Sequence, residues 1–521
     1  MKFFRRFFFA RCHRMAASPA TLSDLLHAQT LARPDAVALI EGDTAISYAA
    51  LQDSALRVAA ALSDIGVRPY DRIAYLGKNS LAYFQLLLGA AYSGAVMVPL
   101  GWRLSSAEIA EMVADARAVV LFVESEFAPL VAALSIRRIE IQSGGNALVP
   151  WLADIAARDP LRAGNPDEAV VQLYTSGTTG RPKGVMLSHA NLLVPRAANR
   201  AAGVVWDQWS DRDTSLVSMP IAHISGTGWA LYSLYAGARG VIVRDFNPPA
   251  VLATIESERI SRMFIVPTAL GMLADAAAAA PEPGDYRSLR CILYGGSPID
   301  APTLAKARAQ FSCGFVQLYG MTESSGAATA LAPDDHHDPA RLASAGRALP
   351  GTEIAIFDSA GRPVERGQLG EVAIRGPGVM LGYWQQTEAT AATIDAAGWL
   401  HTGDVGDIDA AGYLTIRDRI KDMIISGGEN IYAREVEIAL ADHPGCAEVA
   451  VIGTSHPRWG EAVTAVIVPH PGWSLNEAVL AEWVQPRLAR YKVPQRVIVV
   501  EALPRNASGK VLKRVLRDEH R

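Results

Sequence analysis

The chain has 521 residues, a formal net charge of −4 and a pI near 6.3, and 50% of its residues are hydrophobic. Single hydrophobic cores stop growing at about 250–300 residues, so we expect more than one domain. The slightly acidic balance argues against a protein dedicated to nucleic acid, for which a basic surface is typical. The four cysteines are scattered without a CxxC pair. This argues against a disulfide framework or a cysteine zinc site, and we expect a cytoplasmic protein.

The first 17 residues differ from the rest of the chain, because they combine clustered Phe with basic residues and contain no acid. Their apolar runs are shorter than the roughly 7–15 residues of a secretory h-region. Two interpretations remain: a segment that contacts a membrane surface, or an extension ahead of a start at Met15. We expect a disordered extension. We expect no transmembrane segment, because the most apolar long stretch (263–280) contains Pro267 and Asp275.

From about residue 36, short β-rich runs alternate with helical patterns. The first runs predict a hairpin around Gly42, followed by a helix from Tyr48 with Ser47 as its N-cap. Further apolar strands are expected at 72–76, 96–100, 119–123, 169–174, 215–220, 241–246, 263–267, 291–296 and 315–320. Nearly continuous apolar strands that alternate with helices predict parallel, doubly wound sheets covered on both faces.

The pattern changes after about Gly351. Short strands at 352–358, 370–376 and 412–418, separated by turn residues, predict a small barrel-like or sandwich-like antiparallel subdomain. From about Arg419, roughly 100 residues mix helices with strands, as in an α+β domain. We therefore expect an α/β fold with the extension at 1–17, a large multi-subdomain N-terminal domain at 18–417 and a small C-terminal domain at 418–521.

The strongest motif is TSGTTGRPKG, Thr175 to Gly184, directly after the strand predicted at 169–174. Backbone N–H groups exposed by glycines, together with hydroxyls and one lysine, suit a phosphate chain. The spacing differs from that of a P-loop. For an isolated loop of this composition, a polar surface turn would be the simpler interpretation. The candidate phosphate-binding residues are Thr175, Ser176, Gly177, Thr178, Thr179, Gly180 and Lys183.

A second group of candidates lies at the ends of two predicted strands, where ligands bind in open α/β sheets. In LYGMTES (318–324), Tyr319 offers a ring face for a purine, and Thr322 and Glu323 offer oxygen atoms for phosphate and Mg²⁺. The remaining nucleotide-binding candidates at these strand ends are Gly295, Gly296, Ser297 and Gly320.

The string Thr175–Gly184 resembles the signature loop of the adenylate-forming superfamily, which includes acyl-CoA synthetases, amino-acid adenylation domains and firefly luciferase. The resemblance covers residues from about 20 to 515. It also rests on motifs in the family's order at 318–324, 398–409, 426–437 and 503–510.

The resemblance implies roles for the nucleotide-binding candidates. The loop holds the β- and γ-phosphates of ATP, Tyr319 stacks on adenine, Thr322 touches the acyl-adenylate phosphate, and Glu323 ligates Mg²⁺. Asp404 and Arg419 bind the ribose. Asp418 is the hinge about which a mobile C-terminal domain rotates.

Two C-terminal motifs complete this picture. In SGGENIYAREVE, the residues Gly427, Gly428 and Glu429 line the tunnel for the pantetheine of CoA, and we expect a helix to start at Glu429. Lys510, after Ser-Gly, matches the catalytic lysine of the family. A cation is what the reaction requires, because negative charge accumulates on the α-phosphate and on pyrophosphate. Arg458 is a weaker candidate for a CoA contact.

The segment 218–230 resembles the acyl-site segment of the family, with His223 beside the acyl group. A buried histidine with a purely structural role is the alternative. The segment has no carboxylate, which disfavours amino acids, and no Arg or Lys between Ser218 and Trp229, which disfavours diacids. Small residues would leave volume for a fatty chain or an aromatic ring; they are Gly226, Gly228, Gly295, Gly296 and Gly326.

These motifs predict an ATP-dependent acyl-CoA ligase that forms an acyl-adenylate and then a CoA thioester from a medium- or long-chain fatty acid or an aromatic acid. Its partners would be the acid, ATP, CoA and Mg²⁺, without nucleic acid. Peripheral contact with a membrane and a homodimeric state are both compatible with the sequence. The alternatives are an acyl-AMP ligase that loads a carrier protein, a non-catalytic nucleotide- or acyl-binding regulator, and a luciferase-like monooxygenase.

Overall fold

The computed structural model describes residues 18–158, 164–176, 182–427, 429–505 and 511–520. The chain divides into two compact units. Unit 1 extends to Leu342 and adds Gly346–Glu353 and Ile374–Leu400. Unit 2 comprises Ala343–Ala345, Ile354–Ala373 and His401–Arg521.

Unit 1 contains a nine-stranded sheet among its described residues, in the order β15-β14-β13-β12-β11-β9-β10-β1-β2. The strands from β13 to β1 are parallel, and β2, β14 and β15 add antiparallel edges. The strands are β1 (Val37–Glu41), β2 (Thr44–Ser47), β9 (Thr214–Val217), β10 (Arg239–Ile242), β11 (Arg262–Ile265), β12 (Cys291–Gly295), β13 (Gly314–Tyr319), β14 (Thr329–Leu331) and β15 (Arg347–Ala348).

A seven-stranded sheet of unit 1, counted over the described residues, has the order β18-β8-β7-β4-β3-β5-β6. Five strands are parallel, whereas β8 and β18 are antiparallel additions at one edge. The strands are β3 (Arg72–Leu76), β4 (Val96–Leu100), β5 (Ala118–Glu124), β6 (Arg137–Ile141), β7 (Ala169–Ser176), β8 (Pro182–Ser188) and β18 (Gly382–Tyr383). The prediction of parallel, doubly wound sheets is therefore confirmed.

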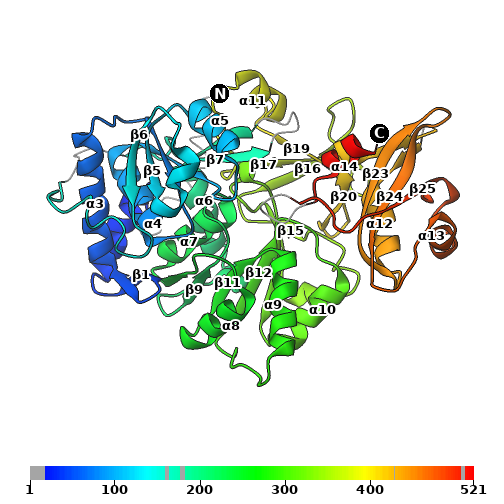
Figure 1. Ribbon diagram of the computed structural model, residues 1–521, viewed down its shortest axis with the longest axis horizontal. Coiled ribbons are helices and arrows are strands. Elements are labelled where there is room, and N and C mark those ends of the chain that lie inside the picture. The colour runs from blue at the N-terminus through cyan, green and yellow to red at the C-terminus, as the bar shows by residue number, and fades with distance from the viewer. Residues whose placement is uncertain (1–17, 159–163, 177–181, 428, 506–510, 521) are drawn as a thin grey trace. The chain divides into compact units, whose positions relative to one another are not determined.

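Helices cover these sheets on both faces (Figure 1). The helix α4 contacts strands of both sheets, and its residues from Leu81 to Ala91 are all buried. Because it is apolar on every side, it can fill the layer between the two sheets. The helix α3 begins at Tyr48, and the Ser47 hydroxyl accepts a hydrogen bond from Ala50 N at 3.2 Å, as the sequence predicts. The helices of unit 1 are α2 (Leu22–Ala32), α3 (Tyr48–Asp64), α4 (Leu81–Ser93), α5 (Ser106–Ala116), α6 (His189–Ala201), α7 (Ile224–Ala236), α8 (Pro248–Ser257), α9 (Pro267–Ala279), α10 (Ala301–Gln310) and α11 (Thr387–Thr393).

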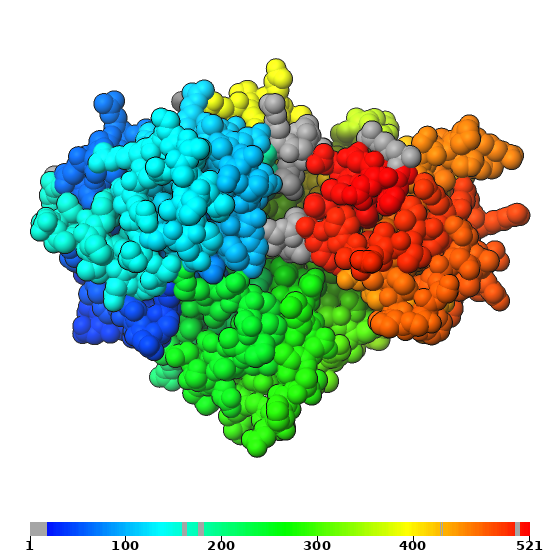
Figure 2. Space-filling model, viewed as in Figure 1, coloured from blue at the N-terminus to red at the C-terminus, as the bar shows by residue number. Residues whose placement is uncertain are grey.

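One hydrophobic cluster joins residues of both sheets with α2, α3, α4 and α7. In the space-filling view, the cyan and green parts of the chain accordingly meet without a break (Figure 2). A separate cluster lies beneath α8, α9 and α10 on the other face of the nine-stranded sheet. Within the described residues, no helix has both the length and the apolar character needed to cross a bilayer.

Unit 2 contains a sheet of four described strands in the order β16-β17-β19-β20: β16 (Glu353–Phe357), β17 (Gly370–Arg375), β19 (Leu400–Ile408) and β20 (Leu414–Arg419). The antiparallel texture is as predicted for the β19–β20 pair. The expected barrel-like closure is wrong, because this sheet is open with β16 and β20 at its edges. Four short strands are too few to close around a filled interior.

The C-terminal part of unit 2 packs helices against a mixed sheet, which confirms the expected α+β texture. Its strands are β21 (Ile424–Ser426), β22 (Glu429–Ile431), β23 (Cys446–His456), β24 (Gly460–Pro469) and β25 (Arg496–Val499). Its helices are α12 (Ala433–Ala441), α13 (Glu477–Val484) and α14 (Lys513–Glu519). The prediction of a helix from Glu429 is wrong. Glu429 pairs with Ser426 in a hairpin, and the helix begins four residues later.

Candidate active site

The predicted phosphate loop connects the two strands of a β-hairpin. Thr175 and Ser176 are the last residues of β7 and pair with Lys183 and Pro182 of β8. The loop is therefore shorter than the sequence motif, and its first and last members have fixed positions in a sheet. Gly177, Thr178, Thr179 and Gly180 lie outside the described residues.

Glu323 lies next to this hairpin, in the short 3-10 turn Thr322–Ser324 that follows β13. Glu323 is only 5% exposed. The hydroxyls of Thr175 and Tyr383 both lie within hydrogen-bond distance of Glu323 Oε1, at 3.4 and 3.0 Å. No described residue gives a hydrogen bond to the second oxygen, Oε2. Thr175, the first residue of the phosphate motif, therefore lies beside Glu323 in unit 1.

The donor set around Glu323 fits a magnesium ion that is bound together with a nucleotide. Mg²⁺ prefers one or two carboxylates plus substrate phosphates to a cage made entirely of protein ligands. Among the described residues there is no cluster of three His, Cys, Asp or Glu side chains that could hold a metal ion. Glu323 would hold the ion, with Lys183 and Thr175 at the phosphate side. The metal would supply charge neutralisation for the phosphates.

The glycines at the ends of β12 and β13 allow these strands to approach closely. Gly295 pairs with Leu318, and a Cβ on Gly295 would lie 2.3 Å from the Leu318 carbonyl oxygen. Gly296 has φ +86°, which favours glycine. A Cβ on Gly320 would lie 2.7 Å from Gly326 O. The candidates therefore lie at the carboxyl ends of two parallel strands, where a ligand can bind. Gly296 and Ser297 follow β12, Tyr319 is the last residue of β13, and Gly320 follows it.

His223 is the N-cap residue of α7, at the start of the predicted acyl segment. Burial lowers the pKa of His223, so its ring is neutral near pH 7. No described residue forms a hydrogen bond with that ring, and the backbone N–H groups of Gly226 and Thr227 bond to the His223 carbonyl instead. A neutral imidazole at a helix start is compatible with an uncharged acyl chain.

Two of the glycines predicted to leave pocket volume do not do so. A Cβ on Gly226 would lie 2.4 Å from Pro220 O, and a Cβ on Gly295 would clash with Leu318 O. At both positions, the missing side chain allows backbone to pack against backbone. A Cβ on Gly326 would instead lie 3.3 Å from the Ile224 side chain, and a Cβ on Gly296 would lie 3.7 Å from the Val266 side chain.

The sequence argument about cations near the acyl segment missed Arg196, which comes from α6. Arg196 Nη2 donates to Gly228 O of α7 at 2.6 Å, and its guanidinium carbon lies 4.7 Å from the Tyr232 ring centroid. Burial lowers the pKa of Arg196 and raises the pKa of Asp207. Periodicity within α6 cannot reveal this contact, because it depends on the packing of two helices.

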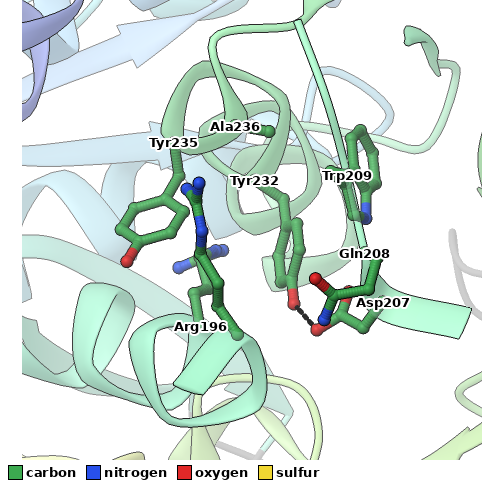
Figure 3. A pocket seen from close by; sticks show the side chains of 8 residues that line it. Arg196, Asp207, Gln208, Trp209, Tyr232, Tyr235 and Ala236 are labelled. Carbon is green, nitrogen blue, oxygen red and sulfur yellow. Dashed lines mark hydrogen bonds between the residues drawn. The ribbon is translucent and has the colours of Figure 1, made fainter. Parts of the chain in front are cut away.

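Arg196, Asp207, Trp209 and Tyr232 line a small cavity, and the Tyr232 hydroxyl points at the Asp207 carboxylate (Figure 3). Asp207 accepts hydrogen bonds from the Tyr232 hydroxyl and from Asn199 Nδ2. The cavity has a volume of about 20 Å³, enough for one water molecule. Arg196 Nε and Trp209 Nε1 are buried without a hydrogen-bond partner among the described residues, and such a water could serve them.

In unit 2, Asp404 and Arg419 face each other across the β19–β20 pair, and Arg419 Nε lies 3.0 Å from Asp404 Oδ1. Asp404 is 6% exposed. The two predicted ribose ligands are therefore neighbours. Asp418 accepts hydrogen bonds from Arg419 N and from Arg434 N, so it ties the end of β20 to the start of α12.

The predicted CoA segment forms the β21–β22 turn. Gly427 has φ +61°, and its N–H donates to Trp459 O at 2.8 Å. Arg458 stacks on Trp459, with its guanidinium carbon 4.4 Å from the ring centroid. The structure thus joins Gly427 and the segment around Arg458, two sequence candidates about 30 residues apart. Gly428 and the predicted catalytic Lys510 lie outside the described residues.

The chain matches family models and known relatives over most of its length. The family model described as AMP-binding enzyme matches residues 26–384, and the model of the AMP-binding enzyme C-terminal domain matches residues 435–510. The chain is 39% identical over 515 residues to a fatty acid–[acyl-carrier-protein] ligase, ScoC, of Streptomyces coeruleorubidus, covering 98% of each chain. It is 41% identical over 489 residues to a feruloyl-CoA synthase of Amycolatopsis sp, covering 93% of this chain and 96% of that one.

A solved structure of o-succinylbenzoate CoA synthetase from Bacillus subtilis, in complex with its acyl-adenylate intermediate, aligns with a TM-score of 0.83 and 32% identity. The alignment covers 95% of this chain and 98% of that one. The chain belongs to the AMP-binding enzyme family, the family of adenylate-forming acid–thiol ligases. The predicted superfamily, fold class and enzyme class are confirmed.

Proposed function

We propose that the chain is an ATP-dependent acyl-CoA ligase that acts on an aromatic acid or a medium- to long-chain fatty acid. The observation that carries the proposal is the convergence of Thr175, Lys183 and Glu323 beside the strand ends that bear Tyr319. The carboxylate of Glu323, the ammonium group of Lys183 and the hydroxyl of Thr175 suit a nucleoside triphosphate with its magnesium ion.

In the first step, a carboxylate oxygen of the acid attacks the α-phosphorus of ATP, and pyrophosphate leaves. Lys183 and the phosphate loop hold the β- and γ-phosphates, and Glu323 would hold a Mg²⁺ ion, which would neutralise phosphate charge. Lys510 stabilises the charge that develops on the α-phosphate. Asp404 and Arg419 bind the ribose in this proposal, and Asp418 acts as the hinge between domains 18–417 and 418–521.

In the second step, the CoA thiolate attacks the carbonyl carbon of the acyl-adenylate, and AMP leaves with the bridging oxygen. The Gly427–Glu429 turn and Arg458 would face the pantetheine. Support for an aromatic or fatty acid comes from the absence of a carboxylate in the segment 218–230, from neutral His223, and from the feruloyl-CoA synthase relative. Arg196 is buried between α6 and α7, where its Nη2 donates to Gly228 O.

Carrier-protein loading is the second candidate, favoured by the similarity to a fatty acid–[acyl-carrier-protein] ligase over nearly the full chain. The test is product analysis with graded aryl, fatty and dicarboxylic acids, each with CoA, with a phosphopantetheinylated carrier protein, and with neither. Pyrophosphate and an acyl-CoA are the expected products. Acylation of the carrier without any acyl-CoA would support the second candidate instead, and absence of pyrophosphate with every acid would contradict both.

A further inference from the structure

A short segment, Met380–Trp384, forms backbone hydrogen bonds both with Glu323 and with the β7–β8 hairpin, which we call the phosphate hairpin. The segment contains β18, which extends the hairpin because Gly382 pairs with Met186 and Tyr383 with Val185. At its start, Met380 N donates to the backbone oxygen of Glu323 at 2.8 Å. At its end, Trp384 N donates to Gly184 O at 2.7 Å. The segment is therefore hydrogen-bonded both to the residue that would hold the metal and to the strand that follows the loop.

The end of the segment is held by its own aromatic side chain. Trp384 Nε1 donates to Asp115 O at 3.0 Å, and the guanidinium carbon of Arg72 lies 3.3 Å from its ring centroid. Tyr383 lies between Met380 and Trp384, whose hydrogen bonds hold the backbone on either side of it. The position of Tyr383 in the strand is therefore held as well.

The Tyr383 side chain contacts both charged groups of the phosphate site. Its hydroxyl donates to Glu323 Oε1 at 3.0 Å, and Lys183 Nζ lies 4.7 Å from its ring centroid. Tyr383 is 7% exposed, so Lys183 lies against a buried ring. A tyrosine hydroxyl is an ordinary hydrogen-bond donor at neutral pH.

These contacts exceed what packing requires. A phenylalanine would fill the same space and keep the ring face for Lys183, but would give Glu323 no hydrogen bond. The hydroxyls of Tyr383 and Thr175 converge on the same oxygen, Oε1. Two donors on one carboxylate oxygen fix the rotation of the carboxylate and direct Oε2 elsewhere.

We propose that Tyr383 is a positioning residue that presents the Glu323 carboxylate to Mg²⁺ and Lys183 to the phosphates as one prearranged unit. This inference rests on the proposed function, since it assigns a role within the same nucleotide site. Tyr383 touches neither metal nor substrate; it acts through its two neighbours.

The experiment measures binding of adenosine 5′-(α,β-methylene)triphosphate by calorimetry over a series of Mg²⁺ concentrations, with the full chain and without turnover. Tyr383→Phe removes only the hydroxyl. We expect it to raise the half-saturating Mg²⁺ concentration about 5–10-fold, equivalent to about 1–1.4 kcal/mol for one charge-assisted hydrogen bond. Saturating Mg²⁺ restores the wild-type affinity. Tyr383→Leu removes the ring too, and should weaken metal-free binding about 3-fold as well.

The matched control is Tyr174→Phe, which removes a buried tyrosine hydroxyl from β7 that donates to Asp115 rather than to Glu323. It should leave the Mg²⁺ dependence within about twofold of wild type. An unchanged Mg²⁺ dependence in Tyr383→Phe, or an equal loss of affinity at every Mg²⁺ concentration, would overturn the positioning role alone. Failure of the wild-type chain to bind the analogue with Mg²⁺ would overturn the proposed function together with it.

Discussion

The phosphate site and the α6–α7 layer both bury charged groups in unit 1, but they use them differently. At the phosphate site, Glu323 receives two hydroxyl groups on one oxygen, and Lys183 rests on an aromatic ring. In the α6–α7 layer, Arg196 donates to a helix carbonyl and lies over the Tyr232 ring, while Asp207 accepts from Tyr232 and Asn199. Neutral partners leave a buried ion able to bind a ligand, whereas polar contacts that join two buried helices stabilise the fold.

The largest expected effect concerns the proposed adenylation step. Lys510→Ala should lower acyl-adenylate formation by about 10²–10³-fold or more, because it removes a cation from the developing charge. Thioester formation from supplied acyl-AMP should be largely spared. Pyrophosphate release and thioester production, measured separately, check the split. Equal losses in both half-reactions would contradict it.

Glu323→Gln keeps the shape of the side chain and removes its charge. We expect adenylation to fall about 10²-fold, because the metal loses its anionic ligand. Pyrophosphate release at saturating ATP measures the effect. Glu126→Gln is the control, since Glu126 is an exposed glutamate that pairs with Lys78. Similar losses in both variants would show that the charge of Glu323 has no special role.

Arg196→Met tests the other half of the comparison. It leaves Gly228 O without this donor and Asp207 without a nearby cation, so the free energy of unfolding should drop by about 2–4 kcal/mol. ATP-analogue affinity should change less than twofold. Urea denaturation measures the free energy of unfolding, and calorimetry measures the affinity for the ATP analogue. Arg200→Met, at an exposed position of the same helix, should stay within about 0.5 kcal/mol of wild type. A loss of nucleotide binding without a loss of stability would break the distinction.

The smallest expected effect is a pH dependence at the start of α7. Because burial lowers the pKa of His223, the unfolded chain binds more protons below about pH 6.5, and stability falls as the pH drops. His223→Asn should reduce this loss, by at most about 1.4 kcal/mol per pH unit. The free energy of unfolding, measured at pH 7.5 and at pH 5.5 for the wild type and for His223→Asn, checks this prediction. An identical pH dependence in the variant would refute the assignment, and exposed His27→Asn serves as control.

The sequence pattern predicted the strand ends and the position of Glu323 after a strand, because these depend on local order along strands. Asp404 and Arg419 were named through the family resemblance, and the structure places them opposite each other across β19 and β20. Tyr383 was not predicted. It lies about 60 residues after Glu323, in a two-residue edge strand with no periodicity of its own. Its sequence signal is no more than a Gly-Tyr-Trp triplet, 382–384, between Leu381 and Gln385.

Arg196 and the glycines show a second limit. The contact from Arg196 to Gly228 joins two helices, so the residues between Ser218 and Trp229 could not reveal it. A small residue can open space or allow close backbone contact, and only the neighbours of Gly226 and Gly295 decide that the second holds. The helix expected at Glu429 was overridden by pairing with Ser426, since tertiary context outweighs helix propensity.

The most direct test of the proposed ligase chemistry follows an oxygen atom. An acid labelled with ¹⁸O in both carboxylate oxygens is incubated with the chain, ATP, Mg²⁺ and CoA, and the nucleotide product is analysed by mass spectrometry. Attack of the carboxylate on the α-phosphorus, followed by thiolysis at the carbonyl carbon, predicts AMP that carries one ¹⁸O atom. Unlabelled AMP, or ADP and phosphate in its place, would contradict adenylation as the first step.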